Sequence, residues 1–250
     1  MITKHPKMQD IPALRALWKE AFGDTDAFLD DFFDTCFATK RCLCTMDGEK
    51  AAAMCYWLDC FREGKPIAYL YAVATAIPYR GEGLCRSLLD QARAILQEQG
   101  YAGILLVPGT PGLFAFYKKL GFTVCSFVGK FVEKAGKPLP LLRLTAKEYA
   151  ACRKDLLPAG AAEHGLSALE FYGRQGMFYR GEGFLLACRV DKGQLFADEL
   201  LGDAWAAPGI VAAFGLETGT FRTPGKDYPF AMYRSLDGSD APGYFGIALD

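Results

Sequence analysis

One glycine-rich loop lies between two apolar segments of different periodicity, and it constrains the fold more than any other feature. The residues AYLYAVAT (68–75) precede it, YRGEG (79–83) forms it, and LCRSLLDQARAILQEQG (84–100) follows it. The last segment repeats apolar residues at helical spacing and stops at a glycine, as helices commonly do. The pattern therefore predicts a buried strand, a tight loop, and a long helix that begins directly after the glycines.

This loop predicts an anion-binding site. The first N–H groups of a helix have no intrahelical partners and lie at the positive end of the helix dipole. Gly81 and Gly83 let an anion approach the backbone, and Arg80 can add a charge-assisted hydrogen bond. A nucleoside-triphosphate loop requires Lys-Ser or Lys-Thr after the glycines, and a dinucleotide loop requires a third glycine, where Arg86 stands. The residues therefore favour a pyrophosphate-containing ligand of another class.

Hydrophobic periodicity predicts the elements around this loop. After a short first strand we expect helices over 13–23 and 26–37, then three antiparallel strands over 41–46, 51–61 and 66–77. In the third strand, Tyr69, Tyr71, Val73 and Thr75 should share one face, with Leu70, Ala72 and Ala74 on the other. After the loop helix come a strand (102–108), a helix (112–120) and a strand (122–131). This order predicts an α/β fold, a mixed α+β sheet covered by helices.

The segment AGKPLP (135–140) is the best linker candidate, so we expect one domain over 1–134 and a second over 135–250. In the second domain we expect strands at 141–144, 183–190, 193–201, 219–223, 229–236 and 243–249, and helices at 146–157, 167–175 and 207–214. YRGEG recurs at 179–183, but FLLACRV, a strand-forming run, follows it. Without a helix behind it, the second copy is expected to be a turn.

The stretch VATAIPYRGEGLCRSLL, with FAFYKKLGF downstream, resembles the GCN5-related N-acetyltransferase (GNAT) superfamily over residues 1 to about 130. The resemblance includes two-domain, Eis-like members, and it implies acetyl-CoA as the acyl donor. The family's loop, Q/R-x-x-G-x-G/A, is implied to hold the CoA pyrophosphate through Arg80, Gly81, Glu82, Gly83, Leu84 and Cys85. Val73, Ala74 and Thr75 are implied to pair with the pantetheine arm. Cys85 and the acidic Glu82 depart from the usual pattern.

The resemblance also implies direct attack of a substrate amine on acetyl-CoA, with Tyr117 as the general acid. The helical spacing of Tyr117 with Leu113 and Leu120 is equally that of a core tyrosine. For the general base, Asp59 is the nearest carboxylate, and Tyr71 or a water could relay the proton instead. Eis-like relatives use the chain's own C-terminal carboxylate, which would belong to Asp250. Cys85 lacks a nearby histidine, so we expect it to pack rather than to act as a nucleophile.

Composition excludes several function classes. The formal net charge of -1 and the lack of a long basic run argue against a nucleic-acid partner. No apolar run approaches the roughly 18 to 20 residues of a membrane span, and the N-terminus lacks an export signal, so a cytoplasmic protein is expected. The nine cysteines are odd in number and lie in apolar stretches, which favours buried free thiols over disulfides or zinc.

Three functions follow as alternatives. The first is an N-acetyltransferase that acts on a primary amine of a small molecule or peptide. The second is a non-catalytic acyl-CoA sensor, and the third is a structural protein with a vestigial loop. The second domain could be a degenerate GNAT-like domain, with the 207–214 helix in place of the loop helix, or an unrelated α+β lid. Four of its aromatic residues could line an acceptor cleft or form core: Phe171, Tyr172, Phe178 and Tyr179.

Overall fold

The computed structural model describes residues 1–249, and its first half follows the predicted order of elements. That half contains six strands and four α-helices: β1 (Ile2–Lys4), α1 (Ile11–Phe22), α2 (Asp26–Thr35), β2 (Cys42–Asp47), β3 (Lys50–Arg62), β4 (Lys65–Thr75), α3 (Leu84–Glu98), β5 (Gly103–Leu106), α4 (Pro111–Lys119) and β6 (Thr123–Lys134). Within residues 1–249 no helix combines the length and the hydropathy that a membrane crossing requires.

The second half differs from the prediction in three places. Its elements are β7 (Leu142–Leu144), α5 (Ala146–Leu156), β8 (Glu163–His164), α6 (Leu166–Gln175), β9 (Met177–Gly181), β10 (Phe184–Asp191), β11 (Gln194–Gly202), α7 (Ala207–Ala213), β12 (Thr218–Pro224) and β13 (Tyr228–Ser235). Strands β8 and β9 were not predicted. The strand expected at 243–249 is wrong, because that segment is buried but pairs with no strand among the described residues.

All strands but β8 follow one another across a single mixed sheet. The order is β1-β2-β3-β4-β5-β13-β6-β12-β11-β10-β9-β7, and β8 pairs with β3. In the first half, α3 connects β4 to the parallel strand β5; in the second, α7 connects β11 to the parallel strand β12. Both halves therefore contain a helical crossover between two parallel strands.

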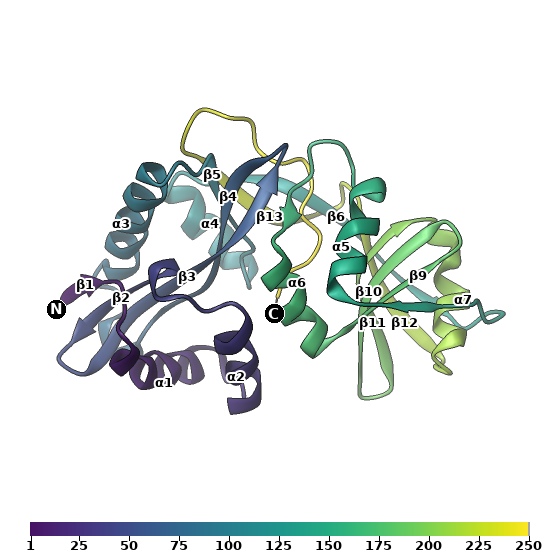
Figure 1. Ribbon diagram of the computed structural model, residues 1–250, viewed down its shortest axis with the longest axis horizontal. Helices are drawn as coiled ribbons and strands as arrows, with labels where there is room; N and C mark the ends of the chain where they lie inside the picture. The colour runs from purple at the N-terminus through teal and green to yellow at the C-terminus, as the bar shows by residue number, and fades with distance from the viewer. Residues whose placement is uncertain (250) are drawn as a thin grey trace.

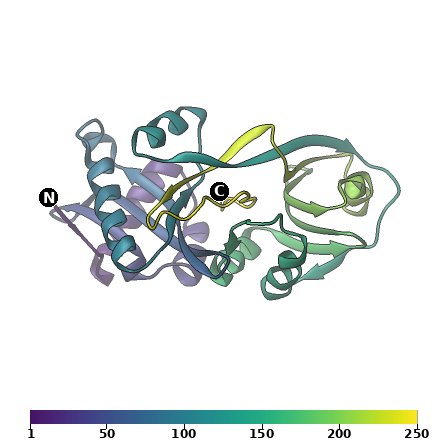
Figure 2. The same cartoon turned by 90° about the horizontal axis from the view of Figure 1, so that it is seen from above.

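The two halves exchange their last strands. Strand β13 from the second half lies between β5 and β6, and β6 continues into the second half to pair with β12. The sheet thus does not divide at the expected boundary after residue 134. Figure 2 shows β6 and β13 crossing together from one lobe to the other.

Helices cover both faces of the first lobe (Figure 1). On one face, α1 and α2 bury Leu14, Trp18 and Phe32 in a core that continues into the second lobe. On the other face, α3 buries Leu88 and Leu96 against β3, β4 and β5. Burying each such leucine fully contributes about 1.5 to 3 kcal/mol. The sheet, held between these layers, fixes the position of the loop that leaves β4.

The last described residues, 244–249, are buried and lie between the two lobes (Figures 1 and 2). We call them the tail. They belong to the core cluster that α1 and α2 cover, together with residues of β3 and β4. The chain therefore returns from the second lobe to the central strands of the first.

Candidate active site

The first YRGEG forms the loop that the sequence predicts, directly before α3. Gly81 and Gly83 have φ angles of 85° and 80°, in the left-handed region where glycine carries no steric penalty. Gly83 is the N-cap of α3, and no side chain caps the free N–H groups there. A Cβ at either glycine would meet no atom within 4 Å, so the space above the loop is open. These features fit an anionic group held by backbone N–H donors.

Two residues next to the loop also fit such a ligand. The Nε of Arg80 donates to the Thr75 carbonyl oxygen at 2.9 Å, so its terminal nitrogens can still reach an anion. The Thr75 hydroxyl is buried and has no hydrogen-bond partner within residues 1–249. Buried polar atoms normally have partners, so an arriving ligand could satisfy this hydroxyl. The loop and the end of β4 therefore offer hydrogen-bond donors to an anionic ligand.

The second YRGEG is a hairpin turn, as predicted. Gly181 pairs with Phe184 across the end of β9 and β10, and the next two residues make the turn. In the second half, the position equivalent to the loop is the segment between β11 and α7. There Asp203 accepts a hydrogen bond from the Trp205 N–H at 2.9 Å. This carboxylate caps the short 3-10 helix, Ala204–Ala206, that leads into α7, and its negative charge disfavours an anion there.

Strand β4 carries a β-bulge that the sequence did not predict. Opposite β3, Tyr71 pairs with Tyr56 and Ala74 pairs with Met54, which leaves Ala72 and Val73 opposite a single residue. Ala72 has a φ angle of 46°. The predicted alternation is therefore wrong beyond Tyr71: Ala72 and Ala74 pack on the face of Tyr69 and Tyr71, whereas Val73 packs with Leu70 on the other.

The bulge lies where β4 separates from β5. The two strands pair only from Ile67 to Tyr69 on β4, so the following backbone groups of β4 have no β5 partner. Val73 to Thr75 are thus placed at an open strand edge that an extended ligand could join.

Substitution of Ala72 by valine should lower the stability of the protein by about 1 to 3 kcal/mol, because a β-branched residue is strongly disfavoured at positive φ. Ala72→Gly should leave the stability unchanged or raise it, since glycine adopts this conformation freely. Urea unfolding of both variants measures the difference. Equal stability of the valine and glycine variants would contradict the strained bulge.

A cavity of about 310 Å³ opens between β4, β5 and helices α1, α2 and α4. It is lined by Trp18, Phe22, Asp24, Phe28, Tyr69, Leu70, Tyr71, Ala72, Val73, Leu106, Val107, Gly109, Leu113 and Tyr117. Asp24 is the only charged residue in this lining, and its carboxylate accepts a hydrogen bond from the Trp18 indole at 2.8 Å. An apolar cleft with a few polar groups is the usual form of a small-molecule site.

Tyr117 lies at this cavity, on α4, and is 7% exposed. Leu120 is also buried, whereas Leu113 is 36% exposed, so the predicted face of α4 is only partly covered. Burial raises the pKa of Tyr117 well above its ordinary value, and the nearby Cys85 and Cys55 add to this effect. The hydroxyl therefore keeps its proton at neutral and moderately alkaline pH, as a general acid must. No described residue forms a hydrogen bond with it.

Asp59 lies outside the cavity lining. Its carboxylate accepts a hydrogen bond from the Tyr101 hydroxyl at 2.6 Å and forms an ion pair with Arg41. On β3 it stands opposite Ala68, before the point where β4 opens. The structure thus does not bring Asp59 together with Tyr117 at the cavity, and its partners give it a structural role.

Asp250 lies outside the described residues, so its proposed role stays a prediction. The residue before it is described: the Leu249 carbonyl oxygen accepts a hydrogen bond from the Tyr71 hydroxyl at 2.6 Å. Tyr71 lines the cavity. The described end of the chain therefore reaches a residue of the candidate site.

The cysteines are all free thiols, and six of the nine are buried. Burial raises the pKa of Cys85 to about 11, so this thiol is protonated at neutral pH and packs rather than attacks. The aromatic residues considered for an acceptor cleft do not line the cavity. Phe171, Tyr172 and Phe178 are buried in the core, and Tyr179 packs on Phe214. The aromatic residues that line the cavity come from α1, α2, β4 and α4 instead.

Comparison with known proteins identifies the family of the first half. Residues 3–125 match the family model described as an acetyltransferase (GNAT) domain. No curated protein sequence matches the chain at a significant level.

Solved structures resemble both halves of the chain. A GCN5-related N-acetyltransferase from Kribbella flavida superposes with a TM-score of 0.73 at 18% identity, over 94% of this chain and 71% of that one. A second from Anabaena variabilis has a TM-score of 0.70 at 14% identity, over 94% and 72% of the two chains. Eis1 from Mycobacterium abscessus has a TM-score of 0.69 at 10% identity, over 95% and 74%. At these identities the likeness shows the fold, and the fold includes the second half.

Proposed function

Because the chain belongs, through residues 3–125, to the GCN5-related N-acetyltransferase superfamily, we propose that it transfers the acetyl group of acetyl-CoA directly to a primary amine. One observation carries the proposal: β4 and Tyr117 line one cavity, and β4 runs from that cavity past its open edge to the uncapped glycine loop before α3. The loop would hold the CoA pyrophosphate and β4 its pantetheine arm. The amine nitrogen would form a bond to the acetyl carbon as the carbon–sulfur bond breaks. The Tyr117 hydroxyl would give its proton to the departing sulfur, and the proton lost by the amine would restore the Tyr117 hydroxyl.

The walls of the cavity support a particular acceptor class, an amine on an apolar or aromatic body. Five aromatic rings from α1, α2 and β4 line it, and Asp24 is the single charge. A carboxylate attracts an ammonium group, and aromatic faces favour both cations and apolar groups. A neutral or anionic acceptor would find no complementary charge in this lining.

The test is acetyl-CoA turnover, followed by release of free thiol, with 2-phenylethylamine, spermidine and a lysine-containing peptide. We expect 2-phenylethylamine to be acetylated with the lowest KM. Tight CoA binding without turnover of any amine would favour the acyl-CoA sensor instead. If CoA does not raise the melting temperature, the protein is neither an acetyltransferase nor an acyl-CoA sensor, since a ligand that binds the folded state must stabilise it.

The two copies of YRGEG provide a matched pair of variants for the loop. Gly83 and Gly183 have φ angles of 80° and 77°, and an added Cβ is unhindered at both. Alanine should therefore cost a similar strain of about 1 to 2 kcal/mol at either position. Only Gly83→Ala should weaken CoA binding, by about tenfold, because its methyl group enters the space where the phosphates would approach. Calorimetric titration with CoA measures both, and equal affinities would contradict the assignment of the loop.

A further inference from the structure

The tail, residues 244–249, is held in place without belonging to a strand. Five of its six backbone carbonyl oxygens accept hydrogen bonds from groups on different parts of the chain. The donors are the Ala162 N–H to Tyr244 (2.9 Å), the Ser126 hydroxyl to Phe245 (3.0 Å), Arg222 Nη1 to Gly246 (3.3 Å), His164 Nε2 to Ile247 (3.0 Å) and the Tyr71 hydroxyl to Leu249 (2.6 Å). A strand would obtain such bonds from one neighbour, so this segment depends on the placement of many side chains.

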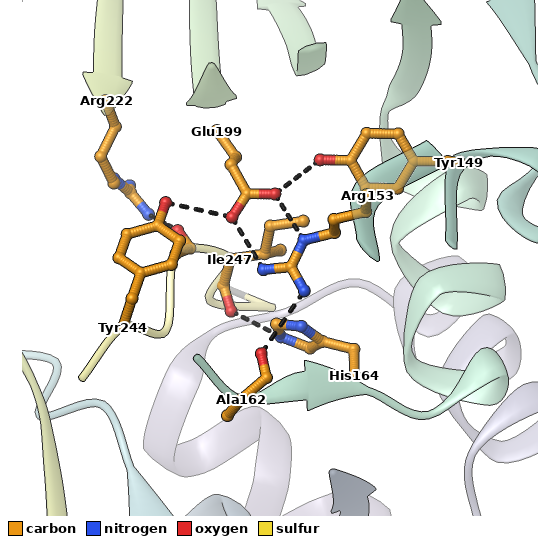
Figure 3. A network of polar contacts seen from close by, with 9 residues as sticks. Tyr149, Arg153, Ala162, His164, Glu199, Arg222, Tyr244 and Ile247 are labelled. Atoms are coloured by element: carbon orange, nitrogen blue, oxygen red, sulfur yellow. Dashed lines mark hydrogen bonds and ion pairs between the residues drawn. The ribbon is translucent and has the colours of Figure 1, made fainter. Parts of the chain in front are cut away.

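A buried ion pair stands at the start of the tail (Figure 3). Glu199 accepts from Arg153 Nε at 2.7 Å and Nη2 at 2.8 Å, and the two side chains are 0% and 2% exposed. The same carboxylate accepts from the hydroxyl groups of Tyr149 at 2.6 Å and Tyr244 at 3.1 Å. Tyr244 therefore connects the tail to the charge pair. A buried pair adds little stability over apolar side chains of similar shape, but it can specify one arrangement.

Gly246 fixes the tail in register against this pair. A Cβ on Gly246 would lie 2.0 Å from the Tyr244 hydroxyl and 2.2 Å from Glu199 Oε1, far inside contact distance. At the next residue, His164 donates to the Ile247 carbonyl oxygen. Burial lowers the pKa of His164 to about 3, so the ring stays neutral with its proton on the donating nitrogen. The tail can therefore slide neither way without breaking a buried hydrogen bond or creating a clash.

Both the start and the end of the tail support the wall of the cavity. The ring of Phe245 packs edge-on against the ring of Tyr69, with 4.9 Å between centroids, and the Leu249 carbonyl receives the Tyr71 hydroxyl. Tyr69 and Tyr71 both line the cavity on β4. The position of the tail thus sets the orientation of two cavity tyrosines.

We propose that residues 244–249 are a positioning element for the acceptor side of the cavity, and that the Arg153–Glu199 pair with Gly246 sets their register. The part of this inference that concerns the acceptor rests on the proposed acetyl transfer. The CoA loop contacts none of these groups in the structure's described residues, so the tail should influence the acceptor and not CoA.

The experiment compares Gly246→Ala with Gly243→Ala. Gly243 directly precedes the tail. A Cβ on Gly243 would meet only the Ala159 carbonyl oxygen, at an ordinary contact distance of 3.9 Å. Hydrogen–deuterium exchange of the peptide covering the tail should be about tenfold faster in Gly246→Ala and unchanged in Gly243→Ala. Equal exchange rates of the tail in both variants would contradict the proposal that Gly246 sets its register. This readout needs no substrate, so it stands even if no amine is acetylated.

The second measurement is the KM for 2-phenylethylamine beside the Kd for CoA. Gly246→Ala should raise this KM about tenfold and leave the Kd for CoA unchanged, because only the tyrosine wall moves. If the tail exchanges faster and the KM does not change, Gly246 does set the register of the tail, but the tail does not position the acceptor. If the KM rises and the affinity for CoA falls as well, the variant has disturbed the whole lobe, and the specific role is likewise overturned.

Discussion

Replacement of Tyr117 by phenylalanine should lower kcat for acetyl transfer by about a hundredfold, the usual contribution of a positioned general acid. The affinity for CoA should stay the same, since the loop at Gly83 is unchanged. The melting temperature should not fall, because no described residue depends on the Tyr117 hydroxyl for a hydrogen bond. Steady-state kinetics and thermal unfolding of the same preparation separate the two effects.

The matched control for Tyr117→Phe is Tyr179→Phe, in the second copy of YRGEG. The Tyr179 hydroxyl reaches only the Met177 sulfur, at 3.5 Å, and lies outside the cavity. The control should retain full kcat. If the Tyr117→Phe variant transfers acetyl groups at the wild-type rate across pH 6 to 9, Tyr117 is not the general acid. Its role would then be that of an ordinary core tyrosine. Since burial raises its pKa, ionisation of Tyr117 should not limit the wild-type rate over this range.

The sequence predicted the loop because its determinants are local. Gly81, Gly83 and the apolar spacing of α3 require only neighbouring residues, and the structure has the loop and the helix at the predicted positions. The context after each YRGEG also distinguished a helix start from a hairpin turn. Such local patterns predict the structure reliably where no tertiary contact favours a different backbone conformation.

The rest of the site depends on contacts between distant segments. The bulge at Ala72 arises where β4 leaves β5, and alanine gives no local signal for a positive φ angle. The exchange of β6 and β13 is likewise set by pairing partners far apart in the chain. Trp18 lies in the helix predicted over 13–23 and lines the cavity, which the helical spacing alone does not indicate. The tail was predicted as a strand because its residues are apolar, but side chains rather than a strand satisfy its backbone.

Loss of Arg153 should have the largest effect on stability. Arg153→Met should destabilise the protein by about 3 to 5 kcal/mol, because it leaves the fully buried Glu199 carboxylate without its counter-charge. For a chain of this size the melting temperature should fall by roughly 10 °C. The double variant Arg153→Met/Glu199→Leu should recover part of this loss, since it removes the buried charge as well.

The pH dependence of this deficit provides the stricter test. Burial alone would raise the pKa of Glu199, but Arg153 and the Tyr149 hydroxyl outweigh it and hold that pKa below its ordinary value of 4.5. In the wild type the pair therefore stabilises the fold above about pH 4.5, and this stability is lost as the pH falls through the lowered pKa. Without Arg153, burial dominates, the pKa of Glu199 rises, and the folded variant favours the protonated acid. The difference in unfolding free energy between wild type and Arg153→Met should thus grow from about pH 5 to pH 8. A deficit that is independent of pH would mean that Arg153 stabilises the second lobe through packing and not through its charge.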